Sequence, residues 1–76
     1  MGVVININSF KNAENLIRKL SYMSGSFDLR QGRYIVNAKS IMGILSLNLE
    51  EPMEISASDF SDKDMKIILH SYVNND

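Results

Sequence analysis

The sequence predicts an α+β fold in which a four-stranded antiparallel sheet is covered on one face by three helices. Apolar residues alternate in four short segments and recur at helical spacing in three others. These segments follow one another in the order β-α-β-β-α-β-α. Because alternating strands have one apolar face, three helices with one apolar stripe each can bury it and leave the other face open to solvent. We therefore expect residues 1–76 to form a single domain.

A strand and a long helix are predicted at the start of the chain. Residues 3–7 are rich in β-branched side chains, with Val3, Ile5 and Ile7 on one side, which predicts a strand. A helix over residues 10–24, capped by Ser9 or Asn12, is expected next. Its apolar residues fall at helical spacing: Ala13, Leu16, Ile17, Leu20 and Met23.

The remaining elements begin with a hairpin. In chain order we expect strand 27–30, strand 34–36, helix 41–45, strand 53–57 and a last helix that starts after Ser61 and continues to Tyr72. Gln31-Gly32-Arg33 joins the first two strands as a tight connection. The segment from Ser61 to Asp64 resembles a capping box, which marks the start of the last helix. Residues 74–76 are expected to form a frayed tail.

The composition excludes several classes of function. The sequence has no cysteine and a single histidine, His70, so disulfides, thiolate catalysis and metal sites built from cysteines or paired histidines are excluded. We expect no metal and no cofactor. A net charge of −1 argues against a nucleic-acid binder. The longest apolar runs, about five residues, are too short to span a membrane, and we expect a cytoplasmic protein.

Charge is divided unevenly along the chain. Residues 1–39 carry six basic and two acidic groups, whereas residues 40–76 carry two basic and seven acidic ones. A bipolar surface would steer a charged partner to one side of the molecule. Alternatively, the two halves interleave in the fold and the asymmetry disappears. The sequence alone leaves both interpretations open.

Residues 37–47 carry a more specific signal. The run Lys39-Ser40-Ile41-Met42-Gly43, followed by an aliphatic helix, closely resembles the regulatory segment of the histidine-containing phosphocarrier proteins (HPr) of the bacterial sugar phosphotransferase system. The resemblance extends without a gap over residues 3–73, as pattern rather than identity outside the segment. It implies the HPr-like open-faced β-sandwich, whose element order agrees with the one predicted above.

The matching stretch at the first helix lacks the histidine that this family phosphorylates. The family motif is of the type Gly-Ile-His-Ala-Arg-Pro-Ala, and the resemblance places Ser9 at the histidine, Lys11 at the arginine and Asn12 at the proline, with only Ala13 in agreement. A shift of one residue would place Asn8 there instead. A serine phosphate is a stable ester and an asparagine amide is no useful nucleophile, so neither residue would sustain a reversible phosphocarrier. His70 is interpreted as a partly exposed residue near the end of the last helix, far along the chain from this site.

Ser40 aligns with the serine that a dedicated kinase phosphorylates in many Gram-positive members of the family. A phosphate on Ser40 would lie at the N-terminus of a short helix beside Lys39 and would add about −1.5 to −2 charges. The purely structural alternative is that Ser40 caps the helix. Both roles are compatible.

The resemblance also implies a partner-docking patch on the short helix. We assign it to Ile41, Met42 and Leu45, with Arg18 of the long helix as a charged rim. We expect Ile41 and Met42 to be exposed, and Ile44 and Leu45 to be the residues that the helix buries. The structural alternative is that the apolar residues belong to the core and Arg18 to a solvated face.

Three functions follow. The first is an HPr-like regulatory or protein-interaction module that is not an enzyme, lacks histidine phosphocarrier activity and serves catabolite repression. Its expected partners are proteins: a serine kinase, a transcriptional regulator or a sugar-transport component, with no membrane and no nucleic acid. The alternatives are a phosphocarrier of the sugar phosphotransferase system, or an unrelated small binding domain of the same topology. The sequence leaves the oligomeric state open.

Overall fold

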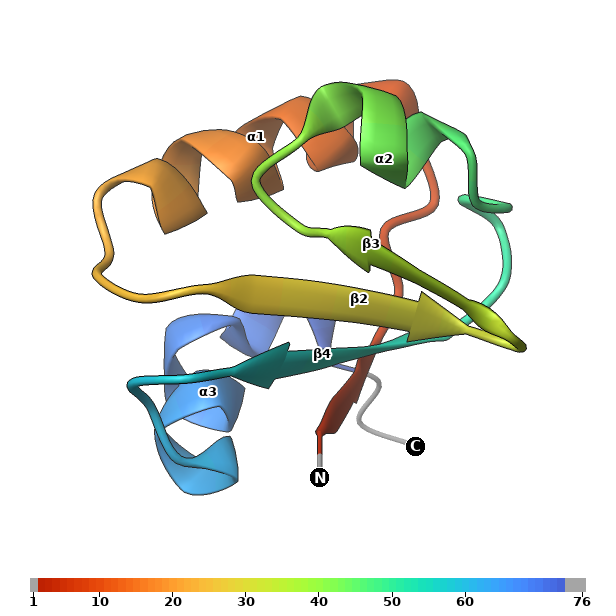
Figure 1. The fold of residues 1–76 in the computed structure, drawn as a ribbon. Helices are drawn as coiled ribbons and strands as arrows, with labels where there is room; N and C mark the ends of the chain where they lie inside the picture. The colour runs from red at the N-terminus through yellow and green to blue at the C-terminus, as the bar shows by residue number, and fades with distance from the viewer. Residues whose placement is uncertain (1, 74–76) are drawn as a thin grey trace.

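The strands and helices follow one another in the predicted order. The computed structural model describes residues 2–73. Their elements are β1 (Val3–Ile5), α1 (Phe10–Ser21), β2 (Phe27–Gln31), β3 (Tyr34–Asn37), α2 (Ile41–Leu45), β4 (Met53–Ala57), α3 (Asp62–Ile68) and a 3₁₀ helix, η1 (His70–Tyr72) (Figure 1).

The four strands form one antiparallel sheet in the order β1-β4-β2-β3. β4 lies between β1 and β2, so that Ile55 is opposite Val3 on one side and Leu29 on the other. β2 and β3 form the predicted hairpin, which closes between Gln31 and Tyr34. Gly32 in the two-residue turn has a φ of 60°, which glycine adopts at no steric cost.

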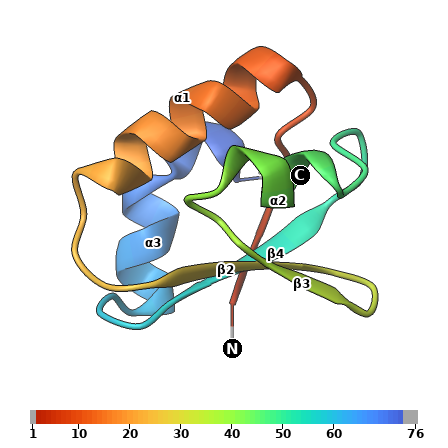
Figure 2. The same ribbon diagram turned by 45° about the horizontal axis from the view of Figure 1, so that its top comes forward.

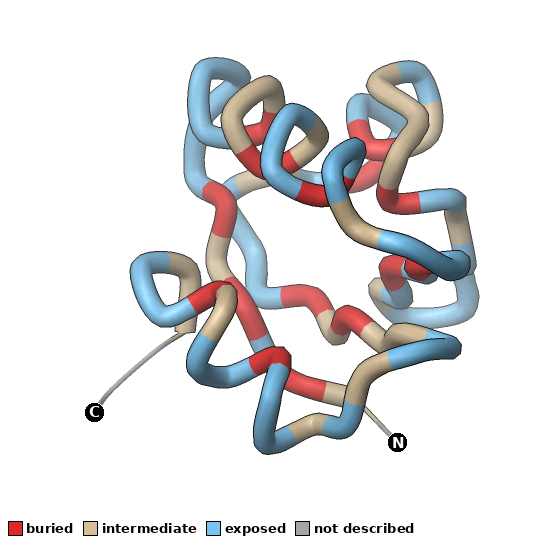
Figure 3. The backbone as a smooth tube through the Cα atoms, turned by 90° about the vertical axis from the view of Figure 1, so that its left-hand side faces the viewer, coloured by how far each residue is buried: buried red, intermediate tan, exposed pale blue. Residues whose placement is uncertain are grey.

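One face of the sheet is buried under the helices and the other faces solvent. Val3 and Ile5 are buried, whereas Val4 between them is 52% exposed, and a similar alternation runs along β2 and β4 (Figure 3). The helices lie on the buried side (Figure 2). All side chains of the core are apolar: Val3, Ile5, Ile7, Ala13, Leu16, Leu20, Phe27, Leu29, Ala38, Ile44, Leu47, Met53, Ile55, Met65 and Leu69. The predicted open-faced α+β sandwich is therefore confirmed.

The position of β4 also decides how the charges are distributed in the sheet. β4 comes from the acidic second half of the chain but lies between two strands of the basic first half. Glu54 on β4 is directly opposite Arg30 on β2. In the sheet the two halves interleave, as the second interpretation of the charge pattern requires.

The connection between β1 and α1 starts earlier than predicted. β1 ends at Ile5 rather than Ile7, although Ile7 is fully buried. Just beyond this end the Asn6 N–H donates to the Tyr72 carbonyl, 2.8 Å away, beside the bridge between Ile5 and Val73. Of the two predicted caps, Ser9 and not Asn12 closes α1.

α1 and α3 are both shorter than predicted. α1 ends at Ser21 rather than at residue 24, because the N–H groups of Tyr22 and Met23 bond to carbonyls only three residues back and tighten the last turn. α3 ends at Ile68, and Tyr72 belongs to the separate η1. Met23 and Tyr72, which lie beyond the two helix ends, still pack partly buried against the core. The predicted frayed tail, 74–76, lies outside the described residues.

Candidate functional site

Ser9 occupies the N-cap of α1 and uses its hydroxyl to close the helix. The Asn12 backbone N–H donates to Ser9 Oγ over 3.1 Å, and the Asn12 side chain donates to the Ile7 carbonyl over 2.8 Å. Ser9 and Lys11 are both exposed. The two residues that the sequence resemblance aligns with the phosphohistidine motif therefore lie at a solvent-facing helix start.

The backbone before Ser9 is held in an uncommon conformation. Asn8 has a φ of 71°, a left-handed geometry that asparagine tolerates better than most residues. Its N–H donates to the carbonyl of Leu49 over 2.8 Å. This bond connects the start of α1 to the loop that joins α2 to β4.

The C-terminal segment returns to the start of α1, which sequence separation did not reveal. The Asn6 N–H bonds to the Tyr72 carbonyl, and Ile5 forms a bridge with Val73. The Tyr72 hydroxyl donates to the Asn12 carbonyl at 3.5 Å, and burial raises the pKa of that hydroxyl above 10.0.

His70 belongs to this returning segment. It is exposed and begins η1, so it lies beyond the end of α3 rather than within the helix as predicted. Tyr72, two residues further on, already bonds to the backbone on either side of Ser9. His70 is thus far from Ser9 in sequence but belongs to a segment that contacts the start of α1.

Ser40 caps α2 in the same way that Ser9 caps α1. The Gly43 N–H donates to Ser40 Oγ over 3.2 Å, and the Ile44 N–H donates to the Ser40 carbonyl over 3.0 Å. The Ser40 side chain is half-buried. A methyl group at position 43 would lie 3.2 Å from Cβ of Val36, so the glycine of this segment allows α2 to approach β3 closely.

The Lys39 ammonium is already hydrogen-bonded to backbone carbonyls and is not free to pair with a phosphate on Ser40. It donates to the Met23 carbonyl over 2.9 Å and to the Gly25 carbonyl over 3.3 Å. It also lies 5.3 Å from the centre of the Phe27 ring. The side chain therefore ties the end of α1 to the β3–α2 connection, a role that its place beside Ser40 in the sequence does not indicate.

The apolar residues of α2 are divided differently from the prediction. Met42 is 78% exposed, as expected, and Ile44 is fully buried, as expected. Leu45 is 43% exposed rather than buried, whereas Ile41 is half-buried and packs against the core. A helix of five residues has too few turns for its spacing alone to show which neighbour of Ile44 faces the sheet.

Arg18 and Ile41 are brought together between α1 and α2. Both line a shallow, open pocket of about 400 Å³, together with Glu14 and Ile17. Arg18 also donates to the side chain of Asn15 over 3.2 Å.

We call the region formed by Arg18, Ile41, Met42 and Leu45 the α1–α2 surface. These four residues are the ones that the sequence assigns to a docking patch. The part that Glu14 and Ile17 play beside them was not predicted, because the helical spacing of α1 does not show which of its side chains α2 approaches.

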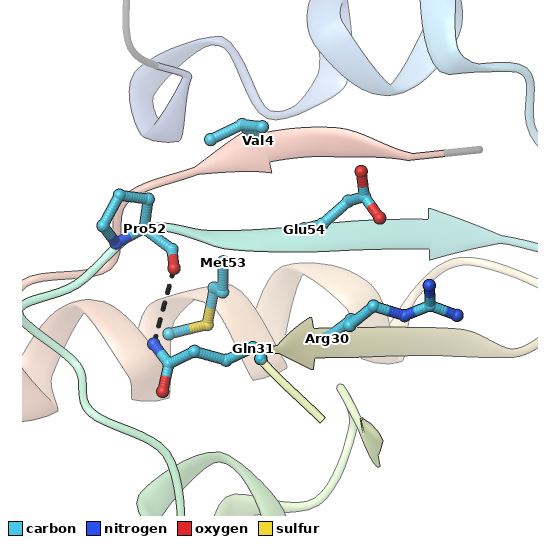
Figure 4. Close-up of a pocket in the computed structure, with 7 residues that line it drawn as sticks. Val4, Arg30, Gln31, Pro52, Met53 and Glu54 are labelled. Carbon is cyan, nitrogen blue, oxygen red and sulfur yellow. Dashed lines mark hydrogen bonds between the residues drawn. The ribbon is translucent and has the colours of Figure 1, made fainter. Parts of the chain in front are cut away.

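A second hollow, of about 260 Å³, lies on the other side of the molecule. It is lined by Val4, Arg30, Gln31, Gly32, Pro52, Met53 and Glu54 (Figure 4). The Gln31 amide forms two 2.8 Å bonds with the backbone of Asn48, one as donor and one as acceptor. This pair fixes the loop before β4 at the edge of the hollow.

Residues 2–73 contain neither a cluster of metal ligands nor a membrane-spanning helix. No three histidine, cysteine or acidic side chains in this range are grouped so that they could hold a metal ion. None of the helices in the same range has the length and apolar character needed to cross a bilayer.

Comparison with known proteins identifies a structural relative. No model of a known protein family matches the chain, and no curated protein matches it. Among solved structures, the crystal structure of HPr-C-His from Thermoanaerobacter tengcongensis matches with a TM-score of 0.75 and 26% sequence identity. The match covers 93% of this chain and 88% of that one. The chain therefore has an HPr-like fold.

Proposed function

We propose that this chain is an HPr-like regulatory module that binds proteins through its α1–α2 surface, carries no phosphate on histidine and is switched by phosphorylation of Ser40. The observation that carries the proposal is the position of Ser40. It caps the helix that presents Met42 and Leu45 to solvent. A change at the cap therefore acts directly beside the proposed docking residues.

Two features argue against histidine phosphocarrier activity. The only histidine in the sequence is His70, which follows α3 in a 3₁₀ turn. The start of α1 instead offers Ser9, whose hydroxyl is a weak nucleophile without an adjacent base and is already engaged as a cap. A phosphoserine formed there would be a stable ester rather than a transferable group.

Phosphorylation of Ser40 would change the docking surface in charge more than in shape. The phosphoryl group adds about −1.5 to −2 charges at neutral pH. It would stand within one turn of Ile41 and Met42, and Arg18 lines the same pocket as Ile41. The modified surface would repel an acidic partner and attract one that presents arginines. Its partners are thus proposed to be proteins that distinguish the two forms: a transcriptional regulator or a sugar-transport component.

A kinase assay tests the switch. The protein is incubated with an HPr serine kinase and ATP, and its intact mass is measured. We expect one added phosphoryl group on the wild type and none on Ser40→Asn, which keeps a side-chain oxygen for the cap. Ser46→Ala is the matched control, because Ser46 is an exposed serine at the other end of α2. An unmodified wild type, or phosphorylation that persists in Ser40→Asn, would refute the switch.

A second assay tests the carrier alternative. The return of residues 70–73 to the β1–α1 connection is the one observation that favours it. The protein is incubated with enzyme I and phosphoenolpyruvate, with His70→Gln as the control. We expect no acid-labile phosphate; an acid-labile phosphate that disappears in His70→Gln would show a phosphocarrier instead.

A further inference from the structure

The open face of the sheet carries a row of four side chains from four different strands. The register places Val4 of β1 opposite Glu54, Glu54 of β4 opposite Arg30, and Arg30 of β2 opposite Ile35 of β3. The row reads apolar, acidic, basic, apolar across the sheet. Val4 is 52% and Ile35 is 58% exposed, and Figure 4 shows the first three on adjacent strands.

This row is complementary to itself when it is reversed. A two-fold axis parallel to the strands, between two facing sheets, would place Val4 against Ile35 of the second copy and Glu54 against its Arg30. The next row, which contains Ser56, Asp28 and Asn37, is small and polar and places Asp28 opposite a serine of the second copy. We propose that the open face binds a second copy of this chain, face to face, in a two-fold symmetric dimer.

Within one chain the Glu54 side chain leans away from Arg30. A methyl group at position 2 would lie 2.5 Å from Cγ of Glu54, so the Glu54 side chain leans toward Gly2, the residue that precedes β1. Arg30 is on β2, on the opposite side of β4, and is exposed. The Glu54 side chain thus leans away from the strand that carries Arg30, and the second copy supplies an opposite charge to each.

The size of the face sets the expected strength of this dimer. With strands about 4.8 Å apart and a rise of about 3.3 Å per residue, four strands make a face roughly 19 Å wide and 15 Å long. The area of this rectangle is well below the roughly 800 Å² per partner of a standard stable interface. The dimer is therefore weak and forms only at high protein concentration. Because its central contacts are between charged side chains, it is also weakened by salt.

Charge-reversed variants test this interface, and mixing them separates contacts between chains from contacts within one chain. Sedimentation equilibrium at low ionic strength is measured from about 10 μM to 1 mM, the range of a weak complex. We expect the wild type to dimerise, and Arg30→Glu or Glu54→Arg to raise the dissociation constant about tenfold or more.

An equimolar mixture of the two variants is expected to dimerise again. In that mixture the glutamate introduced at position 30 of one chain meets the arginine introduced at position 54 of the other. The unchanged Glu54 of the first chain meets the unchanged Arg30 of the second. Each chain meanwhile keeps its own like charges side by side, so that restored dimerisation reports only on contacts between chains.

Matched controls make the same charge changes elsewhere. Lys19→Glu on α1 and Glu50→Arg in the loop before β4 replace side chains that lie outside the open face, and both variants are expected to dimerise like the wild type. Circular dichroism checks that each variant is folded. A wild type that stays monomeric, a dimer that ignores both reversals, or a mixture no more dimeric than its components would overturn the proposal. None of these results would affect Ser40 or the α1–α2 surface, which lie on the helical side.

Discussion

Replacement of Ser40 by alanine tests whether the segment has a structural role apart from any phosphorylation. In the wild type, Ser40 Oγ accepts the Gly43 N–H at 3.2 Å in a partly buried setting. Alanine removes this acceptor and leaves that N–H without its partner. A lost serine cap costs about 1 kcal/mol. For a domain of this size, that lowers the melting temperature by roughly 4–8 °C.

The size of the effect depends on the residue chosen, which makes the prediction specific. Asparagine and aspartate are as good N-caps as serine, so Ser40→Asn and Ser40→Asp should stay within a few tenths of a kcal/mol of the wild type. Urea denaturation gives each free energy of unfolding, and an unchanged slope with denaturant shows that only stability has changed. If Ser40→Ala matches the wild type, or Ser40→Asn loses as much as Ser40→Ala, the cap does not stabilise the protein as argued.

Four further variants test the packing and the titration. Lys39→Met keeps the stem but loses the bonds to two carbonyls and the contact with the Phe27 ring, and should lower the free energy of unfolding by about 1–2 kcal/mol in urea. Ile55→Ala, at a fully buried position in the central strand β4, should lose about 2–5 kcal/mol, whereas Ile67→Ala at a 68% exposed position should change stability by less than about 0.5 kcal/mol. Because burial raises the pKa of Tyr72 above 10.0, the folded state holds that proton more tightly than the unfolded state. The resulting stability is complete below pH 10.0 and is lost as pH rises through the folded-state pKa. Tyr72→Phe should therefore show a shallower loss of stability above pH 10.0, and an unchanged slope would contradict the assignment.

The fold was largely predictable because its information is local and repeated. Alternation along β2 and β4 identified the buried face of each strand, and the helical spacing in α1 identified its core stripe. The ends of the elements were not predictable in the same way. Just beyond the end of β1, Asn6 bonds to Tyr72, a residue that lies at the other end of the sequence. No local pattern records such a partner.

The candidate site shows the same limit. The sequence indicated that Ser40 would cap a helix, because the cap involves only the next three residues. It did not indicate that Lys39 turns back to the end of α1, because that contact joins residues far apart in the chain. It also gave Leu45 the wrong environment. With a single turn in α2, only the docking of the helix on β3, permitted by Gly43, decides which side chains it buries.

The two proposals have a joint consequence, because the surfaces they use lie on opposite sides of one core. The helices cover one face of the sheet, and the row that contains Arg30 and Glu54 lies on the other. A face-to-face dimer would leave both α1–α2 surfaces exposed and directed outward. A partner whose two matching surfaces are linked so that they reach both outer sides would then gain affinity from the second contact without any new interaction. With a weak dimer, the apparent affinity for the partner would thus depend on the concentration of this protein as well as on the phosphorylation of Ser40. In the dimer-breaking variants, the concentration dependence would vanish while the response to Ser40 remained.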